Sequence, residues 1–290
     1  MKRIISISLA AALALSLAAC GAPASESAAP SESASASEST AGTQEAADAG
    51  SDAADAESDL AYVQDKGTLV IGYTVYAPMN YTDENGEFTG FDTELATAVC
   101  QKIGVEPEFV EINWDTKIAE LDGKSIDCIW NGMTLTDDIL ENTACTEPYV
   151  KNAQVVVMKA DAAYSSTADL TGATIVAEGG SAGQSTVEEN ADLSQAELIT
   201  KTVQTDCLME VEAGTADAAV LDLTLASAMI GEGTDYADLA IKDELNVEEY
   251  GVAFRKGSDA PAAVNEAFAE LRAHGGMQDL AEKYGLTLAE

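Results

Sequence analysis

The sequence predicts an α/β fold, and three observations support this prediction. Short runs rich in Val, Ile and Ala alternate along the chain with segments whose apolar residues recur at helical spacing. The sequence shows no internal repeat of fixed period. Beyond residue 60 about 230 residues remain, enough for one large domain or two small ones with proper cores. Strands that alternate with helices in this way form largely parallel sheets with helices on both faces.

The first folded elements show the pattern clearly. Thr68–Tyr73 is predicted to be a strand. Phe91, Leu95, Val99 and Ile103 recur every four residues, which places them on one face of a helix. Further strands are expected at 109–110, 125–130, 154–158, 174–176, 197–200, 218–221 and 250–254, and further helices at 114–121, after Gly183, at 206–213, at a segment with Pro261 in its first turn, and at a last segment that runs to Tyr284 after a Gly275-Gly276 break.

The N-terminus, residues 1–20, is typical of an export signal. Lys2 and Arg3 precede an apolar run, 4–19, that is too short and too rich in Ala for a membrane span. The run ends in the sequence LAACG, which resembles the lipobox of bacterial lipoproteins. That resemblance implies that Cys20 is lipid-modified and becomes the first residue of the mature chain. The alternative is an ordinary signal that is cleaved nearby, with an incidental cysteine.

Residues 21–59 are almost all Ala, Ser, Glu, Asp, Thr and Gly, without any aromatic side chain. A segment with so little to bury is predicted to be a disordered tether between membrane and domain, and a recognition tail is the alternative. The chain as a whole carries a net charge of −37, which argues against nucleic acid as a partner because phosphates would be repelled.

The cysteines do not indicate a metal site. Besides Cys20, the chain contains Cys100, Cys128, Cys145 and Cys207, each in an apolar stretch and without CxxC or Cys/His spacing. The single His is expected in a C-terminal helix. No metal and no cofactor are therefore predicted. Export would permit disulfides, but buried thiols are favoured over them.

Ligands of doubly wound sheets bind where strands end and loops lead into helices. The segments at these places are 74–81, 131–136, 178–184 and the residues around Asp222. Asp222 ends a wholly apolar strand, where a charge is costly unless it meets a cation.

Seven segments, in order, resemble the polar amino-acid-binding family of bacterial extracellular solute-binding proteins, family 3. The resemblance covers about residues 60–285. The segments are YAPMNY at 76–81, GFDTELATAV at 90–99, IDCIWNGMTLTD at 126–137, EPY at 147–149, GS at 180–181, ADAAVLD at 216–222 and YGVAFRKG at 250–257.

The family resemblance implies a two-lobed, type II periplasmic-binding-protein-like clamp that closes about a hinge. Residues 60–154 and 248–290 would form lobe 1, and residues 155–247 would form lobe 2. Hinge closure around a polar amino acid would be the signal for an ABC importer permease. Such a receptor would be extracytoplasmic, held at the membrane by the lipid that the lipobox implies. A monomer is expected because a hinged clamp has no evident need of partners in solution, and no cofactor is expected.

The same resemblance assigns the ligand-binding residues. Tyr76 and Trp114 would wall the ligand with their rings, although Tyr76 also fits an ordinary core tyrosine and Trp114 also fits a residue that staples a helix. Asn131, Gly132 and Thr134 would hydrogen-bond an ammonium or a carboxylate, with a simple turn as the alternative.

The remaining predicted binding residues lie further along the chain. Ser181 and Ala182 open a helix whose N-terminus suits a carboxylate. Asp222 would accept the α-ammonium of the ligand, and a helix N-cap is its alternative.

One position departs from the family pattern. The arginine that normally grips the α-carboxylate is replaced by Ile139, and Arg255 and Arg272 fall outside the expected cleft. A charge-assisted hydrogen bond contributes about 1.5–3 kcal/mol. Either the helix start at Ser181, with Asn131, Thr134 and Lys117, takes over the carboxylate, or the ligand lacks a standard α-carboxylate.

Enzymes are the competing class, because the family's fold also carries dehydratase and peptidoglycan-cleaving relatives. The sequence shows no Ser/His set, metal cluster or evident carboxylate pair, so a non-enzymatic receptor is favoured. A sensor domain is the third alternative, and no signalling domain follows the predicted lobes.

Overall fold

The computed structural model describes residues 58–290, which belong to one compact unit. The predicted signal peptide, Cys20 and all but the last two residues of the predicted tether lie outside the described residues. Within 58–290, no helix is both long and apolar enough to cross a membrane.

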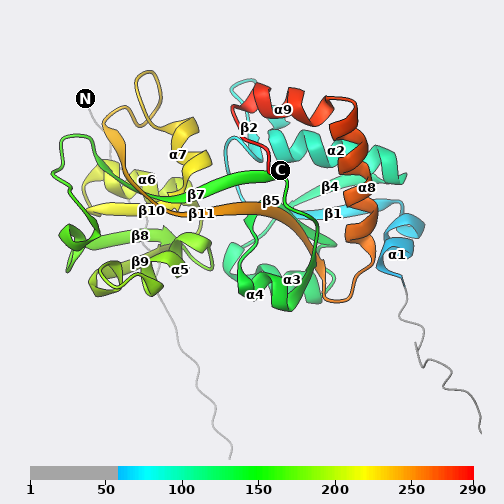
Figure 1. Cartoon of the computed structure of the whole chain (residues 1–290), viewed down its shortest axis with the longest axis horizontal. Helices are drawn as coiled ribbons and strands as arrows, with labels where there is room; N and C mark the ends of the chain where they lie inside the picture. Colours follow the sequence, from blue (N-terminus) through cyan, green and yellow to red (C-terminus); the bar gives the residue numbers. More distant parts are fainter. Residues whose placement is uncertain (1–57) are drawn as a thin grey trace, which may run out of the picture. The chain divides into compact units, whose positions relative to one another are not determined.

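The described chain is a mixed α/β fold with strands and helices in alternation (Figure 1). The strands are β1 (Thr68–Tyr73), β2 (Tyr81–Thr82), β3 (Phe88–Thr89), β4 (Glu106–Glu111), β5 (Cys128–Thr134), β6 (Thr143–Cys145), β7 (Val150–Lys159), β8 (Thr174–Glu178), β9 (Glu197–Lys201), β10 (Ala218–Asp222) and β11 (Leu239–Arg255). The α-helices are α1 (Asp59–Lys66), α2 (Phe91–Ile103), α3 (Lys117–Asp122), α4 (Asp137–Asn142), α5 (Ala182–Glu189), α6 (Gln204–Ala213), α7 (Leu223–Met229), α8 (Ala260–Ala273) and α9 (Gly276–Tyr284), and a short 3₁₀ helix, η1 (Trp114–Thr116), precedes α3.

The main sheet is mixed, so the prediction of largely parallel sheets is only partly right. Its strand order is β4-β1-β5-β11-β7-β10-β8-β9, with β6 paired to β11. The strands β4, β1 and β5 are parallel, as are β10, β8 and β9. Between these two groups, β7 and β11 pair antiparallel with each other, and in Figure 1 they run side by side from one group to the other.

The long strand β11 was only partly predictable. The expected strand at 250–254 is its apolar end, where the chain is buried. The preceding half carries Lys242, Asp243, Glu244, Glu248 and Glu249, and the sequence there lacks a strand-like apolar pattern. It is extended because its backbone pairs with β7 over the register from Leu239↔Lys159 to Tyr250↔Val150. Tertiary pairing overrides local preference at this place.

The helix α2 confirms the predicted apolar stripe and joins the core to the site. Phe91, Leu95 and Val99 are fully buried on it, and each such side chain stabilises the fold by about 1.5–3 kcal/mol. Just before the helix, the backbone at Gly90 lies close to that of Met79, since a Cβ on Gly90 would lie 2.1 Å from the carbonyl oxygen of Met79. This approach lets the helix begin directly behind the pocket described below.

One predicted strand is displaced in the structure, and several short elements have no predicted counterpart, among them α1, α4 and α7. The strand expected at 125–130 lies instead at Cys128–Thr134, so the polar residues 131–134 are part of the strand and do not follow it. The segment 223–229 forms the helix α7, which was not predicted because it is too short to show a helical period.

The four cysteines among the described residues are free, as predicted. Cys100, Cys128 and Cys207 are buried and Cys145 is half-buried. Burial raises the pKa of Cys100 to about 12, so this thiol is inert and serves as a small apolar side chain.

Candidate functional site

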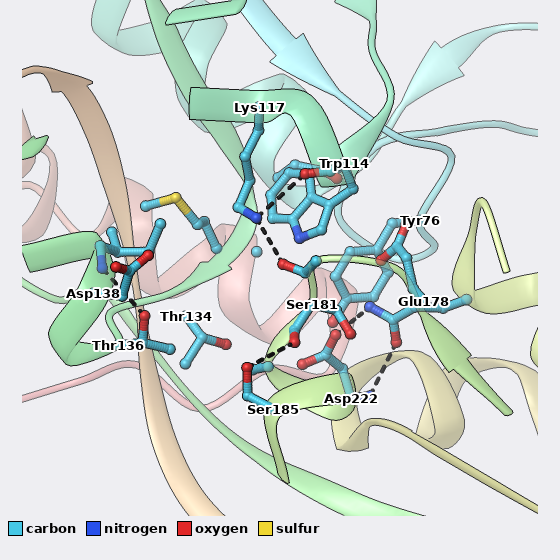
Figure 2. Close-up of a pocket in the computed structure, with 17 residues that line it drawn as sticks. Tyr76, Trp114, Lys117, Thr134, Thr136, Asp138, Glu178, Ser181, Ser185 and Asp222 are labelled. Carbon is cyan, nitrogen blue, oxygen red and sulfur yellow. Dashed lines mark hydrogen bonds between the residues drawn. The ribbon is translucent and has the colours of Figure 1, made fainter. Parts of the chain in front are cut away.

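A pocket lies at the carboxyl ends of β1, β5, β8 and β10, where parallel strands of both groups lead into loops and helices (Figure 2). Its cavity volume is about 100 Å³. At roughly 10–15 Å³ for each water-sized occupant, this is room for about seven to ten atoms of that size. All eight predicted binding residues line it: Tyr76, Trp114, Asn131, Gly132, Thr134, Ser181, Ala182 and Asp222.

Two aromatic side chains border the pocket. Tyr76 is almost fully buried, and its hydroxyl is hydrogen-bonded to Thr224 Oγ1 and, at 2.6 Å, to the hydroxyl of Tyr250. Trp114 begins η1 and packs in the apolar cluster with Leu121. Both readings of Trp114 therefore apply to the structure, since it starts a helix and also borders the cavity.

The side-chain amide of Asn131 forms its hydrogen bonds within the protein. Its Oδ1 accepts hydrogen bonds from the backbone N–H of Thr74 at 3.0 Å and from Thr74 Oγ1 at 2.9 Å. Its Nδ2 donates to the Thr74 carbonyl at 2.9 Å and to Asn80 Oδ1 at 2.7 Å. The amide thus connects β5 to the loop after β1. Asn131 lines the pocket, but its amide oxygen and nitrogen are already hydrogen-bonded within the protein.

Gly132 shapes the pocket wall through its backbone. Its φ is +56°, and its N–H donates to Asp92 Oδ2 at 2.6 Å. The Tyr149 hydroxyl donates to the same carboxylate at 2.8 and 2.9 Å. Burial raises the pKa of Asp92 to about 7, while these two donors oppose the rise. Asp92 is therefore a buried acid that positions the pocket wall from behind.

We expect Gly132→Ala to destabilise the chain by about 2–5 kcal/mol. A left-handed φ costs a non-glycine residue about 1–2 kcal/mol, and overpacking adds about 1–3 kcal/mol. The new Cβ would lie 2.7 Å from Tyr76 Cε1 and 3.0 Å from Tyr250 Cε2. Urea denaturation measures this loss. Gly276→Ala is the control, because its nearest neighbouring atoms would be 3.7 Å away. Equal changes in the two variants would contradict the prediction.

The start of α5 presents hydrogen-bond donors to the pocket. Ser181 is the N-cap, and its Oγ accepts a hydrogen bond from the Gln184 N–H at 3.2 Å. The next two N–H groups, of Ala182 and Gly183, have no partner within the helix. A helix start of this kind favours a negatively charged group.

Asp222 is buried beside the pocket and is held by amides. Its Oδ1 accepts from Asn152 Nδ2 at 2.6 Å and from Gln154 Nε2 at 2.8 Å, and its Oδ2 accepts from Gln204 Nε2. It occupies the N-cap position of α7, but its side chain accepts no hydrogen bond from that helix. Burial raises the pKa of Asp222, and the charge of Glu248 adds to the rise.

Glu178 and Lys117 also line the pocket. Glu178 ends β8 at 2% exposure, and burial raises its pKa to about 8, with Asp222 adding to the rise and Lys117 opposing it. Lys117 Nζ donates to the carbonyls of Gly180 at 2.6 Å and Trp114 at 3.2 Å, and it lies 5.0 Å from the centroid of the Trp114 ring. In Figure 2, Lys117 and Trp114 lie across the pocket from Asp222.

Ile139 occupies the position at which the resemblance leads one to expect arginine, and it lines the pocket from α4. Neither arginine of the folded chain reaches the site. Arg255 binds Asp59 Oδ1 at 2.8 Å and the Ile126 carbonyl at 2.8 Å, and Arg272 binds a backbone carbonyl. Lys117 is thus the only basic side chain among the described residues that line the pocket.

Known proteins of similar sequence and structure bind amino acids. The L-cystine-binding protein TcyJ of Escherichia coli (strain K12) is 30% identical over 227 residues, which cover 77% of this chain and 84% of that protein. A solved substrate-binding protein of an ABC uptake transporter from Streptococcus pneumoniae, with bound histidine, has a TM-score of 0.71 at 29% identity and covers 79% of this chain and 96% of its own. An ancestral amino acid-binding protein, a precursor of cyclohexadienyl dehydratase, has a TM-score of 0.71 at 30% identity and covers 78% of this chain and 99% of its own.

The family itself matches over most of the chain. Residues 69–287 match the bacterial extracellular solute-binding proteins, family 3, and this span includes every residue that lines the pocket. The solved relatives share this mixed α/β fold, which fits the predicted two-lobed clamp. The chain therefore belongs to the bacterial extracellular solute-binding proteins, family 3.

Proposed function

We propose that this chain captures a small amine-bearing solute, foremost a polar amino acid, and presents it to the permease of an ABC importer. The single observation that carries the proposal is Asp222. It is a buried carboxylate at the edge of a pocket, held by three amides and not paired with any cation among the described residues. An ammonium group would supply the missing positive charge and its hydrogen-bond donors. The named ligands of the relatives, cystine and histidine, carry such a group.

Hinge closure between two lobes is the proposed signal to the permease. The proposed lobes are residues 60–154 with 248–290 and residues 155–247. The pairing of β7 with β11 supports this division, because these two strands connect the two parallel groups of the sheet. The pocket takes residues from both segments, for example Trp114 from the first and Ser181 from the second. A solute in the pocket would contact both sides and favour the closed form.

The carboxylate end of an amino acid would meet the start of α5 and Lys117. Ala182, whose N–H has no partner within the helix, lines the pocket there, and Lys117 has one N–H left after its two bonds to backbone carbonyls. With Ile139 in place of arginine, this anchor is weaker than a forked pair. A solute without an α-carboxylate is therefore also within the proposed range.

The proposed setting is the outer side of the cell membrane. The signal at 1–20 and the lipobox cysteine, Cys20, support a lipid anchor, and residues 21–59 would connect it to the binding domain. The proposed active form is a monomer that needs no cofactor. Its strongly negative charge fits a small cationic or zwitterionic solute and does not fit nucleic acid.

An enzyme is the second candidate, and one comparison favours it. The ancestral amino acid-binding protein of similar fold is a precursor of a dehydratase. In this chain, Asp92, Glu178 and Asp222 are buried acids whose pKa is raised, which is a property that general acids share. Turnover of a bound solute, followed by chromatography, would identify an enzyme, whereas unchanged solute identifies a receptor.

A thermal-shift screen of amino acids, amines and short peptides tests the proposal. A ligand at 100 times its dissociation constant stabilises by about 2.7 kcal/mol. For a folded part of this size, that corresponds to a rise in melting temperature of roughly 5–10 °C. Short peptides are the internal control, because they exceed the cavity of about 100 Å³. If no amino acid or amine raises the melting temperature, the proposed function is wrong.

A further inference from the structure

A row of polar side chains crosses the strands β10, β7 and β11 at the edge of the pocket. In the sheet, β7 lies between β10 and β11 and pairs antiparallel with both (Figure 1). Asp222 of β10 stands opposite Gln154 of β7, and Glu248 of β11 stands opposite Asn152 of β7. Because Asn152 and Gln154 are two residues apart on one strand, their side chains lie on the same face of the sheet. An acid therefore lies on each side of a pair of neutral amides.

The two acids accept hydrogen bonds from the same nitrogens. Asn152 Nδ2 donates to Asp222 Oδ1 and to Glu248 Oε1, each at 2.6 Å. Gln154 Nε2 donates to the same two oxygens, each at 2.8 Å. The two carboxyl groups are therefore close neighbours. Because the amides are neutral, they fix both carboxyl groups in position without cancelling a negative charge.

No cation offsets this pair of acids within the described part of the chain. Among the ion pairs of residues 58–290, none includes Asp222 or Glu248. Two neighbouring carboxyl groups that water barely reaches do not both ionise readily, and one of them keeps its proton. Asp222 is 6% exposed, whereas Glu248 is half-buried. The proton is therefore expected on Asp222, whose pKa is raised by burial and then by the charge of Glu248.

The other side chains around Asp222 carry little charge. Tyr76 and Tyr250 are neutral hydroxyls, because burial raises the pKa of both. Gln204 of α6, which donates to Asp222 Oδ2, is a neutral amide. Glu248 is the charged neighbour with the largest effect on Asp222.

Two further ionisable groups face the pocket from β8 and α3. Burial raises the pKa of Glu178 to about 8, so this acid is largely neutral near pH 6. Lys117 lies across the pocket from Asp222 and directs two of its donors at backbone carbonyls (Figure 2). Neither group supplies Asp222 with a hydrogen-bonded cation.

We propose that Glu248 is a positioning residue that keeps a proton on Asp222 before solute binds, so that an ammonium group captured at Asp222 displaces this proton into water. The inference rests on the proposed function, in which Asp222 meets the ammonium of the solute. Glu248 does not line the pocket and acts through Asp222. Its Oε1 also accepts a hydrogen bond at 2.7 Å from Thr134, which does line the pocket. The exchange balances in charge, because one positive charge enters as one proton leaves.

Carbon NMR of the carboxyl groups, on the full chain without solute, follows this proton directly. The signal of Asp222 is the one that is missing in Asp222→Asn. We expect Asp222 to titrate well above about pH 4, where an ordinary aspartate titrates. In Glu248→Gln its midpoint should fall by about one pH unit or more, because the neighbouring negative charge is gone.

The choice of variants separates charge from structure. Glutamine keeps the shape of Glu248 and an acceptor oxygen for Thr134 and the two amides, so a merely structural role of Glu248 would leave the Asp222 midpoint unchanged. Glu244→Gln, at an exposed acid on the same strand, is the charge-matched control and should also leave it unchanged.

Calorimetry of solute binding counts the displaced proton. The full chain is titrated at about pH 6 with L-glutamine and with L-arginine, whose charges are constant near this pH, in two buffers that differ in their heat of ionisation. We expect the release of up to about one proton for each solute bound, and a smaller release in Glu248→Gln. Because the proton competes with the ammonium, the affinity should rise with pH by up to about tenfold per unit between about pH 5 and 7, and less steeply in the variant.

The outcomes separate this inference from the function on which it rests. If Asp222 titrates like an ordinary aspartate, or if its midpoint is the same in Glu248→Gln, the inference is wrong, and the first of these results decides even if the variant does not fold. If a solute binds without releasing a proton, the exchange is wrong while the receptor function stands. If no amino acid or amine binds, the proposed function is wrong and the exchange with it, whereas the titration without solute still decides whether Glu248 holds the proton on Asp222.

Discussion

Asp222→Asn is expected to lower the affinity for an amine-bearing solute by about 2–5 kcal/mol, or roughly 30-fold to several thousand-fold. Asp222 lies at the end of β10, fixed by Asn152, Gln154 and Gln204, and its charge has no partner among the described residues. An asparagine keeps the shape but offers an ammonium only a neutral oxygen. The loss should therefore appear in binding, measured by calorimetry with the best solute of the screen.

The folded chain without solute should tolerate the same change. The variant removes a buried charge, which favours folding. It also replaces one acceptor oxygen of Asp222 by an NH2 group that faces a donor amide, which opposes folding. The net change in the free energy of unfolding should therefore stay within about 1–2 kcal/mol. Asp161→Asn, on the exposed turn after β7, is the control and should alter neither property. An unchanged affinity in Asp222→Asn, with the control also unchanged, would show that the solute's ammonium binds elsewhere.

The chain without solute should lose stability as the pH rises from about 5 to 8. The pKa of Glu178 is raised from 4.5 to about 8 and that of Asp92 from 3.8 to about 7, both chiefly by burial, and that of Asp222 is raised as well. In this pH range the folded chain holds protons that the unfolded chain has released. The free energy of unfolding then falls by up to about 1.4 kcal/mol per pH unit for each such proton. The full contribution is present below about pH 4 and disappears as the pH passes the folded values.

Urea denaturation at several pH values measures this slope. The charged groups that act on Glu178 are Asp222, which raises its pKa, and Lys117, which lowers it. Surface acids whose pKa is lowered, such as Asp83 and Asp259, titrate below the window and do not obscure it. Glu178→Gln should make the slope shallower, and a cationic solute should bind more tightly at pH 8 than at pH 6. Stability that rises steadily from pH 5 to 8 would contradict the assignment of raised pKa values.

Most of the fold was accessible from the sequence because its signals are local. The stripe of Phe91, Leu95 and Val99 fixes α2, and the Gly275-Gly276 pair marks the break at which α9 begins after α8. The antiparallel centre of the sheet was not accessible. It depends on the pairing of β7 with β11, and the charged half of β11 carries no strand-like pattern of its own.

The positions around the pocket were predictable, but the state of their side chains was not. All eight predicted residues line the cavity, yet the Asn131 amide is hydrogen-bonded to Thr74 and Asn80. The sequence analysis predicts the segment 178–184 at the pocket but does not identify Glu178 as one of its lining residues. Its only sequence signal is an acid directly after the apolar strand residues 175–177, the same signal that drew attention to Asp222. The hydrogen-bond partners of a buried polar group come from segments that are distant in sequence, and local sequence patterns do not predict these contacts.

The hydrogen bonds of Tyr76 with Thr224, and of Lys117 with the Gly180 carbonyl, have a consequence for signalling. Each joins a residue of the proposed lobe segment 60–154 to one of the proposed lobe segment 155–247. In the proposed clamp, each of these hydrogen bonds would contribute about 0.5–1.5 kcal/mol to the closed conformation, in addition to what a solute supplies. Closure of the proposed clamp would then depend less on the solute, so a permease would have to recognise more than the closed shape in order to respond only to the loaded form.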